Sequence, residues 1–199
     1  MLPPLSTLKE SSGPDSPLSS ALSTLFEPSP ILSTHLEPHI HGVLASREPT
    51  SYSELIALSI SHIQSWPHDL QAQFIAGHPR IGESKNLSKL SAKEQGATPS
   101  TAPTPPEVLN RLAHLNTCYE KRYPGLRYII FVNGRSRAAV AEALEDQLEL
   151  AHSLSSDEPT LDAIEAVEIG GEEWSSELKR AVEDVGRIAQ SRLKTLSVA

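Results

Sequence analysis

The 199-residue chain has little cysteine, no long apolar run and no excess of positive charge. Its single cysteine, Cys118, excludes an internal disulfide framework and any zinc site built from several thiolates. No apolar run approaches the ~20 residues that a membrane-spanning helix requires. Lys and Arg number 17 against 25 Asp and Glu, a net charge of −8. Because nucleic acids and anionic membranes attract basic surfaces, we expect neither as a partner.

Common signatures of catalysis and of metal binding are also missing. The chain has no P-loop, no Rossmann glycine fingerprint, no His-Glu-x-x-His and no Gly-x-Ser-x-Gly. His35, His39 and His41 lie close together in sequence, and His35 and His39 could share one face of a helix. A metal site would need a third ligand beside that pair and supporting groups around it, and we identify neither. We therefore interpret them as surface histidines and predict no metal site. Cys118 is expected to be a small buried hydrophobic residue within a helix.

Proline is abundant instead, with 16 prolines against 10 glycines. Residues 1–18 are rich in Ser and Pro, so we interpret them as a disordered or loosely docked arm before a domain over residues 19–199. This start lacks the basic residues of a signal peptide, and the last residues are not the Ser-Lys-Leu peroxisomal address. Both a cytoplasmic and a peroxisomal location stay open.

The rest of the chain is typical of helices. Apolar residues recur near a 3.6-residue period, which predicts helices over residues 30–45, 52–66, 106–123, 136–152 and 175–196. Shorter helices are expected over residues 67–77 and from about residue 91, and Pro38 should kink or split the helix that contains it. We predict an all-α single-domain bundle of about seven to nine helices.

Two stretches depart from this helical pattern. Residues 127–132 form the one β-like run, and because one strand cannot make a sheet we expect a buried extended segment. Residues 157–173 are acidic and contain a Gly-Gly pair. We interpret them as a solvated connection with one helical turn.

The first candidate functional segment is Gly-His-Pro-Arg-Ile-Gly at residues 77–82. Pro79 restricts the backbone of His78 to extended angles and so fixes its direction. A positioned histidine with an ordinary pKa near 6.5 suits proton transfer at neutral pH. The structural alternative is a loop histidine that caps a carbonyl at the end of a helix.

The second segment contains Ser91, Glu94 and Gln95. Ser-x-x-Glu matches a capping box, in which the serine begins a helix and the glutamate reaches back to it. The functional alternative places these polar side chains and free backbone amides at the start of a short helix, where they could face a polar ligand.

The third segment is Phe-Val-Asn-Gly-Arg-Ser-Arg at residues 131–137. Asn133 and Gly134 allow a tight turn, and Ser136 can cap the next helix. Arg135 lies at this junction, where its guanidinium could bind a carboxylate or a urea-like oxygen in a forked geometry. The structural alternative is a solvated arginine paired with an acid.

Taken in order, these segments resemble those of the 2-oxo-4-hydroxy-4-carboxy-5-ureidoimidazoline (OHCU) decarboxylase family, whose members form (S)-allantoin in uric acid breakdown. The resemblance spans about residues 22–196. It rests on Phe-Glu-Pro-Ser-Pro at residues 26–30, on residues 76–82, on Ser-x-x-Glu-Gln at residues 91–95, on Leu-Asn-x-x-Tyr-Glu at residues 115–120, and on the apolar run that ends at residues 135–136.

The resemblance implies an all-α homodimer that uses no metal or organic cofactor and acts on the ureidoimidazoline. His78 and Glu94 correspond to the catalytic histidine and glutamate. The implied substrate-binding residues are Ser91, Gln95, Arg135, Pro79, Phe131, Val132 and Asn133, of which residues 131–133 would use backbone amides.

Two other interpretations compete with an active enzyme. One is a non-catalytic helical binding or scaffold domain, and the other is a diverged family member without activity. An active enzyme needs His78, Glu94 and Arg135 to converge on one pocket, whereas a scaffold would leave them scattered.

Overall fold

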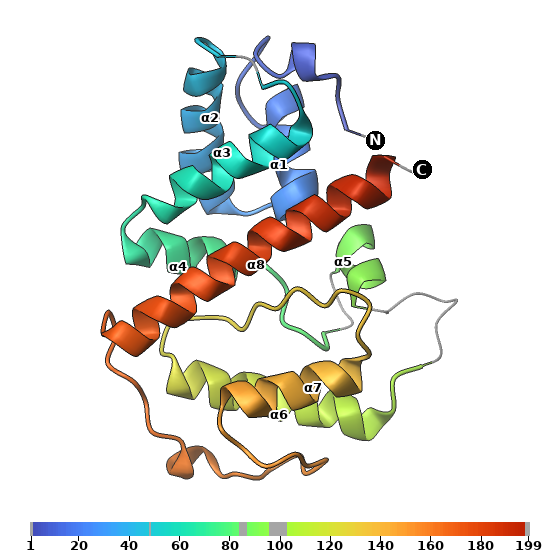
Figure 1. Cartoon of the computed structure of the whole chain (residues 1–199), viewed down its shortest axis with the longest axis vertical. Coiled ribbons are helices and arrows are strands. Elements are labelled where there is room, and N and C mark those ends of the chain that lie inside the picture. The colour runs from blue at the N-terminus through green and yellow to red at the C-terminus, as the bar shows by residue number, and fades with distance from the viewer. Residues whose placement is uncertain (1, 48, 84–86, 96–102, 198–199) are drawn as a thin grey trace. The chain divides into compact units, whose positions relative to one another are not determined.

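The computed structural model describes residues 2–47, 49–83, 87–95 and 103–197. Within these ranges it contains eight α-helices and no β-strand, which confirms the predicted all-α class and helix number. The chain divides into two compact units, Met1–His78 with Leu178–Ala199 and Pro79–Glu177. The long helix α8 (Glu172–Ser197) belongs to both, because the division falls near its first turns (Figure 1).

The first unit contains α1 (Pro17–Phe26), α2 (Glu37–Leu44), α3 (Tyr52–Gln64), α4 (His68–Ala76) and most of α8. Ser51 caps the start of α3, since its hydroxyl accepts a hydrogen bond from the Glu54 N–H. The apolar stripe of α8 is buried as its period predicts, at Leu178, Val182, Val185 and Ala189.

The segment expected as a loosely docked arm makes defined contacts in the structure. Leu8, beside the 3₁₀ turn Leu5–Thr7, is only 1% exposed, and the Gly13 N–H donates to the Glu37 carboxylate. Ser16 caps α1, and Pro17 occupies the first helical position, where its missing N–H costs little. The boundary placed after residue 18 therefore falls inside α1, a helix that the periodicity did not predict.

Pro38 interrupts regular α-helix as expected. A π-helical turn, Leu32–Leu36, precedes α2, and Pro38 lies in the first turn of α2. Proline cannot donate a backbone hydrogen bond, so the change of helix type just before it fits its chemistry. The predicted helix over residues 30–45 is thus two segments of different geometry.

The second unit contains α5 (Lys89–Glu94), α6 (Pro106–Arg122), α7 (Arg137–Gln147) and the 3₁₀ turn η3 (Leu161–Ala163). Helices α6 and α7 pack against each other (Figure 1). Residues 127–132 form the predicted extended segment, with Tyr128, Ile129 and Val132 buried. Part of the loop that the sequence suggested before residue 106, at residues 96–102, lies outside the described residues.

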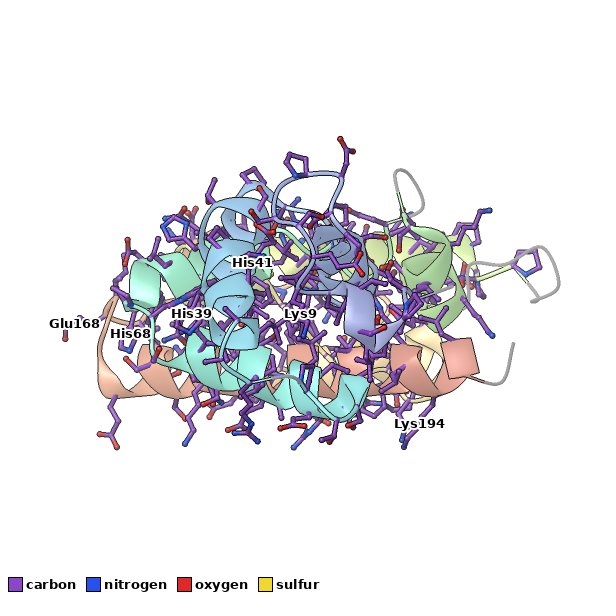
Figure 2. All side chains as sticks on the ribbon, turned by 90° about the horizontal axis from the view of Figure 1, so that it is seen from above. Lys9, His39, His41, His68, Glu168 and Lys194 are labelled. Carbon is purple, nitrogen blue, oxygen red and sulfur yellow. The ribbon has the colours of Figure 1, made fainter. Side chains whose placement is uncertain are left out.

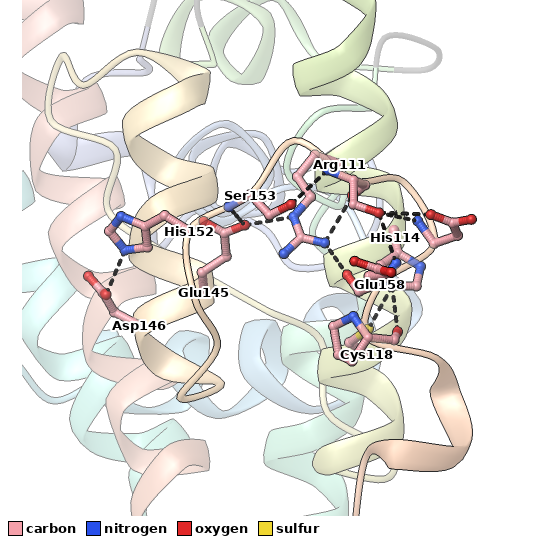
Figure 3. A network of polar contacts seen from close by, with 11 residues as sticks. Arg111, His114, Cys118, Glu145, Asp146, His152, Ser153 and Glu158 are labelled. Carbon is pink, nitrogen blue, oxygen red and sulfur yellow. Dashed lines mark hydrogen bonds and ion pairs between the residues drawn. The ribbon is translucent and has the colours of Figure 1, made fainter.

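A buried ion pair holds the acidic connection against α6 (Figure 3). The Arg111 Nε atom lies 2.6 Å from Glu145 Oε1, and both side chains are 1% exposed. Arg111 also donates to the carbonyl oxygens of Ser155 and Glu158. One turn along the helix, His114 contacts the Pro159 carbonyl and the buried Cys118 thiol. The connection includes the predicted helical turn, η3.

Helix ends account for most remaining differences. Helix α7 ends at Gln147, five residues before the predicted end, and Glu149 follows with a φ of 57°. A backbone in this left-handed region cannot continue a right-handed helix. No helix among the described residues is long and apolar enough to cross a membrane.

Candidate functional site

His78 follows directly on the end of α4, where Gly77 is tightly packed. A Cβ added at Gly77 would lie 2.8 Å from Ser29 Cβ and 3.2 Å from the Phe74 carbonyl oxygen. Gly77 has a φ of −68°, so it ends α4 as predicted without entering the left-handed region. Close approach of Ser29, not backbone conformation, is what requires glycine before the histidine.

The His78 imidazole is held as a neutral base. Its Nδ1 lies 3.3 Å from the Phe74 carbonyl oxygen. Because a carbonyl only accepts, Nδ1 carries the proton and Nε2 holds the lone pair. Burial of the 4% exposed side chain and the nearby Arg192 cation lower the pKa of His78 from 6.5 to about 4, partly opposed by Glu27. The predicted capping contact is therefore present, and it is made by a neutral imidazole.

Arg192 is the functional candidate that the sequence reasoning missed. It projects from α8 and is 2% exposed, and its Nη2 donates to Glu27 Oε1 at 2.7 Å. Its Nη1 faces the carbonyl oxygens of Thr24 and Leu25 at the end of α1. A buried arginine whose charge acts on His78 is better suited to bind an anion at that histidine than an exposed one.

A sequence signal for Arg192 did exist. The buried positions of α8 recur three or four residues apart, and Arg192 follows Ala189 by three in the same register. A charge in an apolar stripe is rarely buried without a partner. Glu27, which lies in the Phe-Glu-Pro segment, supplies that partner.

In the second unit, α6 fixes the loop that begins at Pro79. The Glu120 carboxylate accepts two hydrogen bonds from the Arg80 guanidinium, at 2.6 and 2.9 Å. The Asn116 amide donates to the Ile81 carbonyl at 3.0 Å. Asn116 and Glu120 are four residues apart on one helix face, which explains the Leu-Asn-x-x-Tyr-Glu motif as a clamp on this loop.

The capping-box prediction for Ser91 is wrong. Helix α5 begins earlier, because the Ser88 hydroxyl accepts the Ser91 N–H at 3.1 Å and so caps the helix. Ser91 is buried within the helix, and the half-buried Glu94 is its last residue. These two side chains therefore lie on the body and the end of α5 and not on its first capping position.

Gln95 connects α5 to the same loop. Its Oε1 accepts the Gly82 N–H at 3.0 Å, and its Nε2 faces the Arg80 carbonyl at 3.4 Å. Gly82 has a φ of 87°, and its Cα approaches Leu112 closely enough that a Cβ would lie 3.1 Å from Leu112 Cβ. The loop is thus held by Gln95 on one side and α6 on the other.

Arg135 is exposed and turned back on its own chain. Asn133 and Gly134 have φ values of 50° and 77°, which gives the predicted tight turn. The guanidinium of Arg135 donates to the carbonyl oxygens of Val132 and Phe131 at 3.0 and 2.7 Å. Ser136 caps α7 as predicted, through the Ala139 N–H.

The candidate residues therefore divide between the two units. His78 lies in the first unit, together with Arg192 and Glu27. The second unit contains all the other candidates: Pro79, Ser91, Glu94, Gln95, Phe131, Val132, Asn133 and Arg135.

Other histidines and an acidic pocket involve none of these candidate residues directly. His39, which projects from α2 (Figure 2), stacks on His62 with ring centroids 3.2 Å apart, and His35 packs against Trp66. No group of three or more potential ligands in the described part of the chain could hold a metal ion.

A pocket of about 470 Å³ in the second unit is lined by Tyr123, Gln147, Glu172, Glu173, Ser176 and Glu177.

Comparison with known proteins gives a family and a fold. A search of curated proteins finds no match. A solved structure titled "Crystal structure of OHCU decarboxylase in the presence of (S)-allantoin" matches with a TM-score of 0.51 and 18% identity, over 81% of this chain and 92% of that chain. The family model described as OHCU decarboxylase matches residues 12–194. The chain therefore belongs to the OHCU decarboxylase family.

Proposed function

We propose that the protein decarboxylates OHCU to (S)-allantoin as a cofactor-independent carboxy-lyase. The observation that carries this proposal is His78, a buried neutral base with its lone pair on Nε2 and a buried arginine nearby. A neutral imidazole at physiological pH can accept or orient a proton, and the arginine complements an anionic substrate. Family membership over residues 12–194 supports the same reaction.

The chemistry requires little beyond proton handling and charge stabilisation. The bond between the ring carbon and the carboxylate breaks, CO₂ leaves, and the electron pair enters the adjacent unsaturated C–N system. The ring nitrogen that receives this charge takes up a proton from solvent. A second proton adds to the adjacent ring carbon from one face, and the substrate hydroxyl loses its proton to become a carbonyl, so one proton is consumed for each carboxylate lost. Fixed hydrogen-bond donors lower the cost of the transient negative charge.

His78 and Glu94 are the proposed catalytic residues. They share two tasks, which are to orient the substrate hydroxyl and to deliver the proton to one face of the ring. Because the face that receives the proton sets the configuration of the product, holding the ring in one orientation produces (S)-allantoin.

Substrate binding is assigned to polar groups of the second and third candidate segments and to an arginine. Ser91, Gln95 and the segment of residues 131–133 are proposed to hold the heterocycle and its ureido group. Arg192 is the better candidate for the carboxylate than Arg135, because Arg192 is buried and its charge acts on His78, whereas Arg135 is exposed. We also propose a homodimer, which sedimentation analysis of the purified chain tests directly.

Circular dichroism tests the proposal, because uncatalysed decay of OHCU gives racemic allantoin. Freshly made substrate should yield an (S)-allantoin signal with the wild-type protein. The rate at which (S)-allantoin forms should fall at least about 100-fold in His78→Asn and in Glu94→Gln, because the loss of a general acid or base typically has an effect of this size. A wild-type protein that gives only the racemic background, or variants of near-normal rate, would overturn the assignment.

A further inference from the structure

Glu27 has an unusual backbone for its residue type. It follows the last residue of α1 with a φ of 67° and a ψ of 142°. Residues other than glycine avoid positive φ, and such positions persist where surrounding contacts force them, often at functional sites. Glu27 is also only 6% exposed, so a charged side chain is buried on a strained backbone.

The contacts of Arg192 explain what this conformation achieves. Glu27 Oε1 accepts a hydrogen bond from Arg192 Nη2 at 2.7 Å, while Arg192 Nη1 faces the Leu25 and Thr24 carbonyls at 3.3 and 3.5 Å. These carbonyls belong to the last turn of α1, where a helix carries partial negative charge. The end of α1 and the Glu27 carboxylate thus form one cradle around the guanidinium.

The cradle also balances the charge next to His78. The Phe74 ring packs on both Phe26, which precedes Glu27, and His78, with ring centroids 6.1 and 5.4 Å apart, so the end of α1 lies near the imidazole. Arg192 lowers the pKa of His78 and Glu27 raises it. Without the carboxylate, a buried and unbalanced cation would remain beside the base. With it, the guanidinium keeps one orientation and its charge is partly compensated.

We propose that Glu27 is a positioning residue, whose buried carboxylate fixes the Arg192 guanidinium beside His78 for the substrate carboxylate. This inference rests on the proposed function for its effect on the substrate. The competing explanation is that Glu27 merely neutralises a buried arginine for folding, as Glu145 does for Arg111.

Steady-state kinetics separates the two explanations. Glu27→Gln keeps the size of the side chain and one acceptor oxygen but removes the charge. We expect its KM for OHCU to rise about 10-fold or more, the scale of one charge-assisted hydrogen bond, with a smaller change in kcat. Glu27→Asp, which restores the charge, should recover part of the loss. The matched variant Glu145→Gln should leave KM within about twofold of wild type. If the KM of Glu27→Gln also stayed within about twofold of wild type, the proposal would be overturned.

A second readout does not depend on activity. We expect NMR titration of His78 to give a lower imidazole pKa in Glu27→Gln/Arg192→Gln than in Arg192→Gln alone, because the first variant lacks the nearby carboxylate. An equal pKa in the two would overturn the proposed placement of Glu27. A wild-type protein without decarboxylase activity would instead reject the proposed function and leave this titration as the test of Glu27.

Discussion

Two buried arginine–glutamate pairs, one in each unit, have nearly the same nitrogen–oxygen distance and different surroundings. Arg111 and Glu145 lie 2.6 Å apart and Arg192 and Glu27 lie 2.7 Å apart, and all four side chains are buried. The first pair is enclosed by a loop, since Arg111 also binds two carbonyls and Glu145 accepts the Ser153 N–H. The second acts on the charge state of a histidine. Burial of an ion pair therefore does not identify function, whereas the group beside it can.

The largest expected difference comes from removing each arginine. Arg192→Met should lower kcat/KM for OHCU at least about 100-fold, because a charge-assisted contact to the substrate is lost. Arg111→Met should keep kcat/KM within about threefold. Both should destabilise the fold by about 3–5 kcal/mol, because each leaves a buried carboxylate without its partner. Urea unfolding and steady-state kinetics on the same samples check this, and equal activity losses in the two folded variants would remove the distinction.

The burial of His78 should make the free energy of unfolding depend on pH. Its pKa is depressed from 6.5 to about 4, so the unfolded chain binds a proton in this interval that the folded chain does not. The contribution of His78 to the free energy of unfolding is fully present above pH 6.5, and it falls by about 3 kcal/mol as the pH decreases to about 4. Urea unfolding between pH 7 and pH 4 measures the effect, and the difference between wild type and His78→Gln isolates it. A pH-independent difference would contradict burial of a neutral imidazole.

A smaller effect is expected at the glycine that precedes His78. Gly77→Ala would push a Cβ against Ser29 and should cost about 1–3 kcal/mol. Gly42→Ala is the matched control, because a Cβ there meets nothing within 4 Å in helix α2, and it should gain about 0.5–1 kcal/mol. Thermal unfolding of both variants distinguishes close packing from a simple helix preference. If the two variants shifted in the same direction, the packing argument would fail.

The smallest expected effect compares the backbones of the two glutamates. Glu27 has positive φ, so Glu27→Gly should be more stable than Glu27→Ala by about 1 kcal/mol. Glu145 lies inside α7, so Glu145→Gly should be less stable than Glu145→Ala by about the same amount. Denaturant titration of the four variants gives the two differences. The same order at both positions would contradict the strain assigned to Glu27.

Much of the fold follows from patterns in the sequence. The 3.6-residue period predicted the helices that carry long apolar stripes, and Pro38 and Pro106 lie near helix starts as proline chemistry requires. Helix α1 was missed because it is short and lies in a stretch rich in Ser and Pro. The start of α5 was misplaced because Ser88 and Ser91 are both plausible caps, and only the backbone decides between them.

The candidate site was less predictable than the fold. His78 was identified because the Gly-His-Pro sequence constrains its backbone directly. Arg192 was missed because its meaning depends on Glu27, 165 residues away in sequence, and no local motif relates the two. The sequence predicts Arg135 as a binding residue because it lies beside a turn, but in the structure its guanidinium donates to two nearby carbonyl oxygens. Short sequence motifs identify residues whose backbone is constrained by their neighbours. Buried ion pairs between distant residues can be identified only from the tertiary structure.

Replacing each whole pair by apolar side chains tests the distinction most directly. Arg111→Met/Glu145→Leu and Glu27→Leu/Arg192→Met both remove a buried pair without leaving a lone charge, which is often tolerated by the fold. The measurement is the rate of (S)-allantoin formation from fresh OHCU, followed by circular dichroism. The account predicts a rate close to wild type for the first double variant and only racemic background for the second. Equal rates in the two folded proteins would contradict it.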